Sequence, residues 1–357
     1  ATALSMSERN PTIDIAKGLG IILVVLGHNW IVAHEHGELF RVIFSFHMPL
    51  FFFLSGVVLK GSDSFRQFAF HRADTLLKPY LLVLSTWGLA RIVLASVPIV
   101  PYFLGLLYGT GYTIEWVPLW YLPHLFIALL VSWCLLRCAG DYAGSRRVML
   151  AMALISLLVG ILTRNALASF DPQKLDMLNH LVGNKENVFP GLPLSIDLLG
   201  FSLAFILSGY AFKEYVFRFR FRIGYFIAAL VAFSALHFNF DETIDLHMRQ
   251  YGVFWIATSQ AALGIYLSLS IAALLQGLSK LAAMLAYIGA GSLFILIFHS
   301  WMEWKVFNIL EKLHHQAMLN GMLSLLVGIA GPLLLLALVR KQAILSRLLL
   351  PAKKKPS

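Results

Sequence analysis

Four histidines lie within apolar segments of the sequence: His28, His47, His124 and His299. Ionisable side chains are costly inside a membrane and usually face a protein interior or a water-filled cavity. All four fall toward the same side of the predicted spans, so we expect a polar pocket that opens outward. A neutral imidazole, with an unperturbed pKa of ~6.5, can accept a hydroxyl proton as a general base. It can also carry an acyl group covalently.

His28 shares one face of its predicted helix with Asp14 and Lys17. At 3.6 residues per turn the three side chains fall within about 60° of one another, and Lys17 and His28 are separated by roughly 16 Å. This face therefore presents a cation near one end and an imidazole near the other. The alternative is a packing stripe in which His28 bonds a neighbouring carbonyl.

Other polar and aromatic residues have both a structural and a functional interpretation. Ser55 and Gly56 permit close helix contact. Arg72 and Lys78 suit cytoplasmic positive charge or a phosphate clamp. Trp120 and Tyr121 suit an aromatic belt or stacking against a sugar. Because the histidines include no short-spaced ligand pair, a Zn²⁺ site is not expected.

The composition is that of a membrane protein. Hydrophobic residues make up 59% of the 357 residues and charged residues 13%, whereas about a quarter of a soluble domain is charged. The net charge of +10 resides in short loops between apolar blocks. This placement indicates membrane topology first, and contact with anionic lipid or an anionic cofactor second, rather than nucleic-acid binding. Cys134 and Cys138 form no disulfide framework.

Hydropathy predicts an all-α, polytopic transmembrane bundle of about ten helices. Basic residues lie in every second loop, which places both termini in the cytoplasm. The outer loops then hold, among others, Glu35, the segment from Asp171 to Glu186, and the segment from Glu303 to Glu311. The predicted spans lie near residues 13–33, 42–60, 75–97, 118–137, 147–163, 193–212, 222–239, 252–276, 281–301 and 319–340.

The chain is predicted to form one membrane domain, residues 1–357, with a cytoplasmic segment at 1–12 and a basic tail at 341–357. The first apolar block is too long for the hydrophobic region of a signal peptide and contains Asp14 and Lys17, so we expect it to be retained. The segment 164–193 is rich in turn signals and is expected to form an outer loop rather than another span.

Two segments resemble a known family. Residues 13–28 and 44–56 are similar to the first two helices of the integral-membrane acyltransferase 3 family, especially its fucose-4-O-acetylase-like branch. Weaker similarity occurs at residues 72–80, 119–125 and 288–299. Lysine stands at position 17, where the family usually has arginine, and the family's paired arginines are reduced to His71 and Arg72.

The resemblance implies O-acylation of a carbohydrate in a bacterial inner membrane. Acetyl-CoA would be the donor, and an envelope polysaccharide or a lipid-linked oligosaccharide the acceptor. It implies His28 as the essential histidine, with Lys17 as the basic residue before it and Phe52 and Ser55 as the phenylalanine–serine motif. Coenzyme contacts are expected from Lys17, Ser55, Arg72, Lys78 and Tyr80. Supporting or acceptor-binding roles are expected for Asp14, His47, Trp120, Tyr121, His124 and His299.

Two other functions are compatible with the residues. A transporter or flippase for a glycan or small solute would use the buried polar groups as a proton relay. A non-catalytic subunit of a polysaccharide-exporting assembly would have the same membrane composition. No visible internal repeat and few carboxylates within the spans favour the enzyme over the transporter.

Overall fold

A computed structural model describes residues 10–34, 37–60, 64–169, 172–184, 186 and 188–352. Predictions that concern residues 1–9, Glu35, Asp171 and the tail residues 353–357 lie outside these ranges. Within them the chain is almost entirely helical, and one two-stranded antiparallel sheet pairs Ile244 with Tyr251 and Asp245 with Gln250. The predicted all-α class is therefore confirmed.

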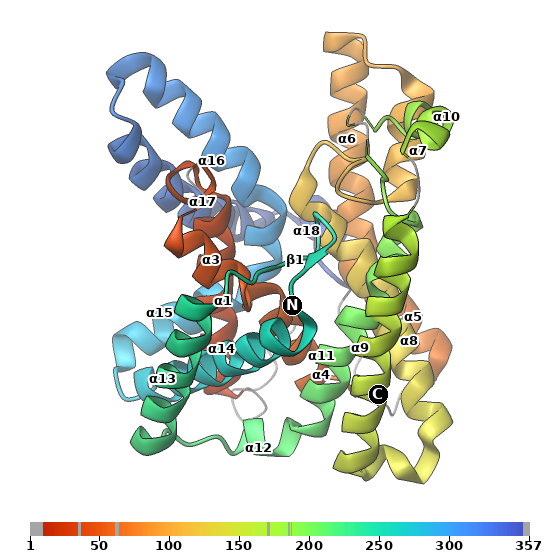
Figure 1. Ribbon diagram of the computed structural model, residues 1–357. Coiled ribbons are helices and arrows are strands. Elements are labelled where there is room, and N and C mark those ends of the chain that lie inside the picture. Colours follow the sequence, from red (N-terminus) through yellow and green to blue (C-terminus); the bar gives the residue numbers. More distant parts are fainter. Residues whose placement is uncertain are drawn as a thin grey trace. The chain divides into compact units, whose positions relative to one another are not determined.

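Figure 1 shows the order of the elements. The α-helices are α1 (Pro11–His28), α2 (Trp30–Ala33), α3 (Glu38–Phe44), α4 (His47–Val57), α5 (Phe65–Arg72), α6 (Lys78–Ala95), α7 (Ile99–Tyr108), α8 (Tyr121–Ala139), α9 (Arg146–Ala168), α10 (Asp176–Leu181), α11 (Leu199–Ala211), α12 (Lys213–Phe217), α13 (Ile223–Asn239), α14 (Phe254–Leu275), α15 (Ser279–Ala290), α16 (Ser292–His314), α17 (Ala317–Lys341) and α18 (Ala343–Leu349). A π-helical turn covers Ala73–Leu77, and 3₁₀ turns cover Val117–Trp120, Gly140–Gly144, Pro172–Leu175 and Pro193–Leu198. The strands are β1 (Ile244–Asp245) and β2 (Gln250–Tyr251).

Among the described residues, nine helical segments are long and apolar enough to cross a membrane. The nine are Pro11–His28, Glu38–Val57, Phe65–Ala95, Val117–Gly144, Arg146–Ala168, Pro193–Ala211, Phe254–Leu275, Ser292–Leu313 and Ala317–Lys341. The predicted span at 222–239 corresponds to α13, which is also apolar. Its 17 residues make it one residue shorter than α1, the shortest of the nine segments. A multi-pass helical membrane protein is thus confirmed.

The single helix predicted at 281–301 is wrong. The chain forms two helices there, α15 and α16, which meet at Gly291. A Cβ atom at Gly291 would overlap the side chain of Leu333, so the break occurs where another helix approaches closely. The outer loop predicted from Glu303 to Glu311 is also wrong, because α16 continues through both residues.

The chain divides into two compact units, which are described separately. Of the described residues, the N-terminal unit contains those up to Val58 together with Gly209–Leu338, and the middle unit contains Leu59–Ser208 and those from Val339 onward. In the N-terminal unit α1 packs against α4, α14, α15 and α16. Its apolar face joins a buried cluster that includes Val24, Val25 and Ile295. This packing holds α1 along most of its length.

The helices α1 and α15 approach each other closely in the N-terminal unit. A Cβ atom at Gly18 would overlap the carbonyl oxygen of Leu285, and one at Gly289 would overlap that of Asp14. Two glycines therefore let the backbones of the two helices touch, as small residues do at membrane helix interfaces. The contact fixes the part of α1 that precedes His28.

Candidate active site

His28 is the last residue of α1, and one residue separates it from the start of α2. The next residue, Asn29, is extended (φ −67°, ψ 145°), and its side chain accepts a hydrogen bond from the backbone N–H of Ile31 at 3.1 Å, which caps α2. His28 is half-buried, whereas His47 is 3% exposed and His299 is fully buried. Of these three residues, His28 is therefore the least buried.

The rings of His28 and His299 have centroids 5.6 Å apart and are tilted by 44°. The Phe44 ring makes edge contacts with the rings of both His28 (6.4 Å) and His47 (4.7 Å). The structure thus brings three of the four predicted histidines together in the N-terminal unit.

Backbone carbonyls determine which ring nitrogen is protonated in the two buried histidines. His47 Nδ1 is 2.8 Å from the carbonyl oxygen of Ile43, and His299 Nδ1 is 2.9 Å from that of Ile295 and 3.0 Å from that of Leu296. A carbonyl only accepts, so both Nδ1 atoms must donate. In each neutral ring Nε2 is therefore an acceptor. Among the described residues, Nε2 of His299 has no hydrogen-bond partner.

A β-hairpin brings two further polar residues toward His28. His247 and Arg249 lie in the turn between β1 and β2. The pKa of His247 is lowered to about 4 by burial and, to a smaller extent, by the charges of Arg249 and His28. Arg249 has a left-handed backbone (φ +55°), which is rare for a residue with a side chain, and its Nη1 donates to the carbonyl oxygen of His247 at 2.9 Å.

Sequence reasoning missed this hairpin because a short polar loop between two apolar blocks has no periodic signal. Its buried anchors are Ile244, Leu246 and Tyr251. The Tyr251 hydroxyl also bonds the Thr258 hydroxyl in α14 at 2.7 Å. The hairpin is therefore attached to the helical core.

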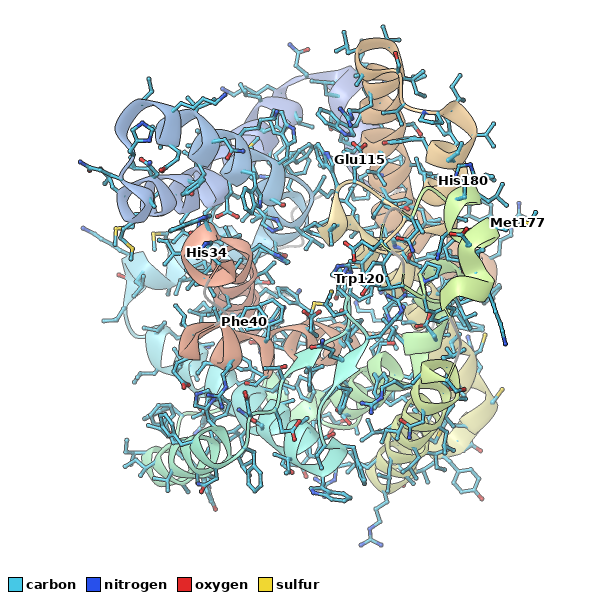
Figure 2. All side chains as sticks on the ribbon, turned by 45° about the horizontal axis from the view of Figure 1, so that its top comes forward. His34, Phe40, Glu115, Trp120, Met177 and His180 are labelled. Carbon is cyan, nitrogen blue, oxygen red and sulfur yellow. The ribbon has the colours of Figure 1, made fainter. Side chains whose placement is uncertain are left out.

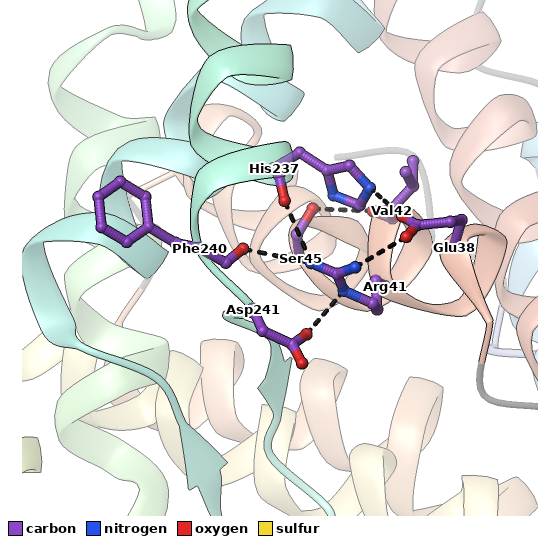
Figure 3. Close-up of polar contacts among 7 residues, drawn as sticks. All are labelled: Glu38, Arg41, Val42, Ser45, His237, Phe240 and Asp241. Atoms are coloured by element: carbon purple, nitrogen blue, oxygen red, sulfur yellow. Dashed lines mark hydrogen bonds and ion pairs between the residues drawn. The ribbon is translucent and has the colours of Figure 1, made fainter.

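An ionic network holds the segment that leads into the hairpin (Figure 3). Arg41 of α3 pairs with Glu38 at 2.9 Å and with Asp241 at 2.7 Å, and donates to the carbonyl oxygen of His237 at 3.1 Å. Glu38 also contacts Nε2 of His237 at 2.6 Å. These contacts connect α3 to the end of α13 at Asn239, five residues before β1 begins at Ile244.

Three other predicted site residues belong to the N-terminal unit. Asp14 and Lys17 are half-buried on α1, which is continuous from Pro11 to His28, so both lie on the helix that ends at the histidine. Ser55 is half-buried, and its hydroxyl donates to the carbonyl oxygen of Phe51 at 2.8 Å within α4. The coenzyme contacts expected of Lys17 and Ser55 stay predictions.

In the middle unit, Lys78 has several protein partners. Its ammonium group lies 2.6 Å from the Asp74 carboxylate, and it donates to the carbonyl oxygens of Leu350 (2.6 Å) and Arg347 (3.2 Å) near the end of α18. A phosphate at Lys78 would have to compete with these groups. Its assignment as a coenzyme ligand stays a prediction.

Two more predicted coenzyme ligands have structural partners in the same unit. The guanidinium of Arg72 lies 5.0 Å from the centroid of the Phe68 ring, a cation–π contact. The hydroxyl of Tyr80, a buried residue, donates to the carbonyl oxygen of Leu106 at 2.6 Å. The Tyr80 hydroxyl is thus engaged by the backbone. The coenzyme contacts expected of Arg72 and Tyr80 stay predictions.

Trp120, Tyr121 and His124 form a buried group at the start of α8. The Trp120 ring, labelled in Figure 2, lies 5.6 Å from that of His124 and 6.4 Å from that of Tyr121. His124 is 0% exposed. The aromatic residues therefore pack inside the middle unit, and their predicted contact with a sugar is not tested by this arrangement.

Within the described ranges, no three His, Cys, Asp or Glu side chains are grouped closely enough to hold a metal ion. The chemistry available at the end of α1 is instead that of a partly accessible imidazole supported by two buried ones. Such a group is suited to proton transfer or to nucleophilic attack.

Comparison with known proteins identifies the class. The acyltransferase domain family matches residues 10–340. The nodulation protein NolL of Sinorhizobium fredii is 39% identical over 85 residues, which are 21% of this chain and 23% of that protein. No solved structure matches the chain. Because the family match covers nearly all of the sequence, the chain belongs to the integral-membrane acyltransferase 3 family.

Proposed function

We propose that this protein is an O-acetyltransferase of the bacterial cytoplasmic membrane. It moves an acetyl group from acetyl-CoA to a hydroxyl of an envelope polysaccharide or a lipid-linked sugar. The observation that carries the proposal is the half-buried His28 at the broken end of α1, next to the buried ring of His299. The family match supports acyl transfer as the reaction class.

His28 acts on the acceptor hydroxyl in the proposed reaction. Its unprotonated ring nitrogen takes the hydroxyl proton while the oxygen attacks the thioester carbonyl. The new C–O bond forms as the C–S bond breaks, and the imidazolium returns its proton to the coenzyme A thiolate. In the covalent variant the ring nitrogen attacks the thioester carbonyl, and coenzyme A leaves as the thiolate. The sugar hydroxyl then attacks the acetyl group, the bond from acetyl to ring nitrogen breaks, and the hydroxyl proton passes by way of the freed imidazole to the thiolate.

The two buried histidines orient His28. Their Nδ1–H groups are engaged by carbonyls, so in their neutral forms they can only accept a hydrogen bond at Nε2. An imidazole that donates one N–H to such an acceptor keeps its other nitrogen unprotonated. His299 is thus suited to hold His28 in the tautomer that a base or nucleophile requires, as an orienting partner does for other catalytic histidines.

Lys17 provides a test of donor binding. Replacing Lys17 with alanine is expected to raise KM for acetyl-CoA by on the order of tenfold, because one charge-assisted hydrogen bond to a phosphate of the coenzyme is lost. The value of kcat should change little, because Lys17 lies roughly 16 Å along α1 from His28. Steady-state kinetics with varied acetyl-CoA measure both constants.

The matched control is Lys17→Arg, which keeps the positive charge and adds a bidentate fork. It should retain a KM close to that of the native protein. An unchanged KM in Lys17→Ala would remove Lys17 from the donor site.

The function is tested with purified protein, [¹⁴C]acetyl-CoA and a panel of methyl glycosides, with mass spectrometry of the products. The proposal expects an acetylated glycoside and stoichiometric release of coenzyme A. The transporter alternative is assayed with the same protein in liposomes. Movement of glycan across the bilayer with no acetylated product would overturn the enzyme assignment.

A further inference from the structure

Asn29, directly after His28, is the centre of a buried hydrogen-bond network in the N-terminal unit. Its Nδ2 donates to Glu303 Oε1 at 2.8 Å, to the carbonyl oxygen of Gly321 at 3.1 Å and to Ser324 Oγ at 3.2 Å. The side chains of Asn29, Glu303 and Ser324 are each no more than 2% exposed. One amide therefore connects the end of α1 to both α16 and α17.

The same side chain also shapes the backbone at His28. The Oδ1 of Asn29 accepts from Ile31 N–H at 3.1 Å, while its backbone N–H donates to the carbonyl oxygen of Leu26 at 3.1 Å. Asn29 therefore ends one helix and begins the next, and both of its amide atoms are used. Because His28 is its immediate neighbour, the network determines where α1 stops and how far His28 extends.

Two glycines of α17 make room for this network. A Cβ atom at Gly328 would overlap Glu303, and one at Gly321 would overlap the side chain of Ile31. The glycines are seven residues apart, so they lie on one face of the helix. The close approach of α17 to Asn29 and Glu303 is thus built into its sequence.

Glu303 connects the network to the histidine pair. It is four residues after His299 on α16, so the two side chains lie on one helix face. In the described part of the chain Glu303 forms no ion pair, and its Oε2 has no hydrogen-bond partner. Its observed contact is the one with Asn29, in which it acts as a hydrogen-bond acceptor.

We propose that Asn29 is a positioning residue for His28, and that Glu303 and Ser324 hold it by accepting its hydrogen bonds. The inference rests on the proposed acetyl transfer by His28. Glu303 acts here through Asn29 and exchanges no proton with the substrate. Loss of the network displaces His28, and even a small displacement of a reacting group reduces the rate strongly.

The first test replaces Asn29 with leucine, which has a similar volume and no hydrogen bonds. The value of kcat for acetyl transfer from acetyl-CoA to the best methyl glycoside acceptor should fall by on the order of tenfold, with KM for acetyl-CoA unchanged. The matched control is Asn320→Leu. Asn320 is also fully buried, and it links α16 to α17 through a different hydrogen bond, which its Nδ2 donates to Glu311 at 2.8 Å. Equal kcat values in the two variants would overturn the proposal.

The second test separates hydrogen bonding from proton transfer at Glu303. Glu303→Gln keeps a carbonyl oxygen for Asn29 and should retain kcat and the pH–rate profile, whereas Glu303→Leu should behave like Asn29→Leu. A glutamine variant as impaired as the leucine variant would show that Glu303 exchanges a proton, and would overturn the positioning role. Ser324→Ala removes one acceptor and should reduce kcat less than Asn29→Leu does.

A third measurement does not require acetyl transfer. Diethyl pyrocarbonate modifies accessible neutral imidazoles, and mass spectrometry reports the rate at His28 in each purified variant. The rate should change in Asn29→Leu and Glu303→Leu and stay native in Glu303→Gln and Asn320→Leu. If the native protein transfers no acetyl group, the proposed function fails. If the His28 labelling rate is the same in all variants, the positioning inference fails.

Discussion

Replacing His28 with alanine is expected to lower kcat for acetyl transfer by ~10²–10⁴-fold, the usual contribution of a positioned acid–base group. His28 is the half-buried histidine of the cluster, whereas His47 and His299 are buried and bonded to carbonyls. Neither of these two can readily replace it. Steady-state rates of [¹⁴C]acetyl transfer by purified protein measure the effect.

The matched control is His34→Ala. His34 is an exposed histidine six residues farther along the chain, and its ring contacts that of Trp30 at 4.8 Å. This variant should keep native activity. Both variants should elute as folded proteins in size-exclusion chromatography, because the residues of α1 before His28 stay packed against the neighbouring helices. Full activity in His28→Ala would remove His28 from the reaction.

Replacing Gly18 with alanine is expected to reduce the free energy of unfolding by about 3 kcal/mol, at the upper end for overpacked sites. The added methyl group would overlap the carbonyl oxygen of Leu285, a backbone atom that cannot move aside without shifting α15. Because Gly289 of α15 lies equally close to the carbonyl oxygen of Asp14, neither helix backbone has room for an added methyl group. The midpoint of thermal unfolding in detergent measures the loss.

Gly224→Ala provides the control for this substitution. Gly224 is exposed in the first turn of α13, and a Cβ atom there would meet no atom within 4 Å. Alanine is the better helix former by roughly 1 kcal/mol, so this variant should be as stable as the native protein or slightly more so. Equal unfolding midpoints for the two alanine variants would contradict the close α1–α15 contact.

Hydropathy predicted most of the helices because a bilayer imposes both a length and an apolar composition on each span. It could not predict where helices break. The interruption at Gly291 depends on the approach of Leu333, and the one at Asn29 depends on partners nearly 300 residues away. Such breaks are determined by tertiary contacts, which leave no periodic signal in the local sequence.

The histidine cluster could be predicted in part because ionisable groups stand out in apolar segments. His28, His47 and His299 were found in this way. His247 and Arg249 were not, since polar residues are ordinary in a loop. Glu303 was predicted to lie in an outer loop, because its charge alone does not indicate burial. Its contacts with Asn29 and with Gly328 of α17 are tertiary contacts that the local sequence does not reveal.

The proposed function requires that this chain itself moves acetyl groups by means of His28. The direct measurement incubates native protein and His28→Ala in parallel with radiolabelled acetyl-CoA and the glycoside panel, and counts label in the glycoside fraction. We expect labelled glycoside from the native protein and almost none from the variant. Equal labelling by both proteins, or labelling by neither, would contradict the proposed function.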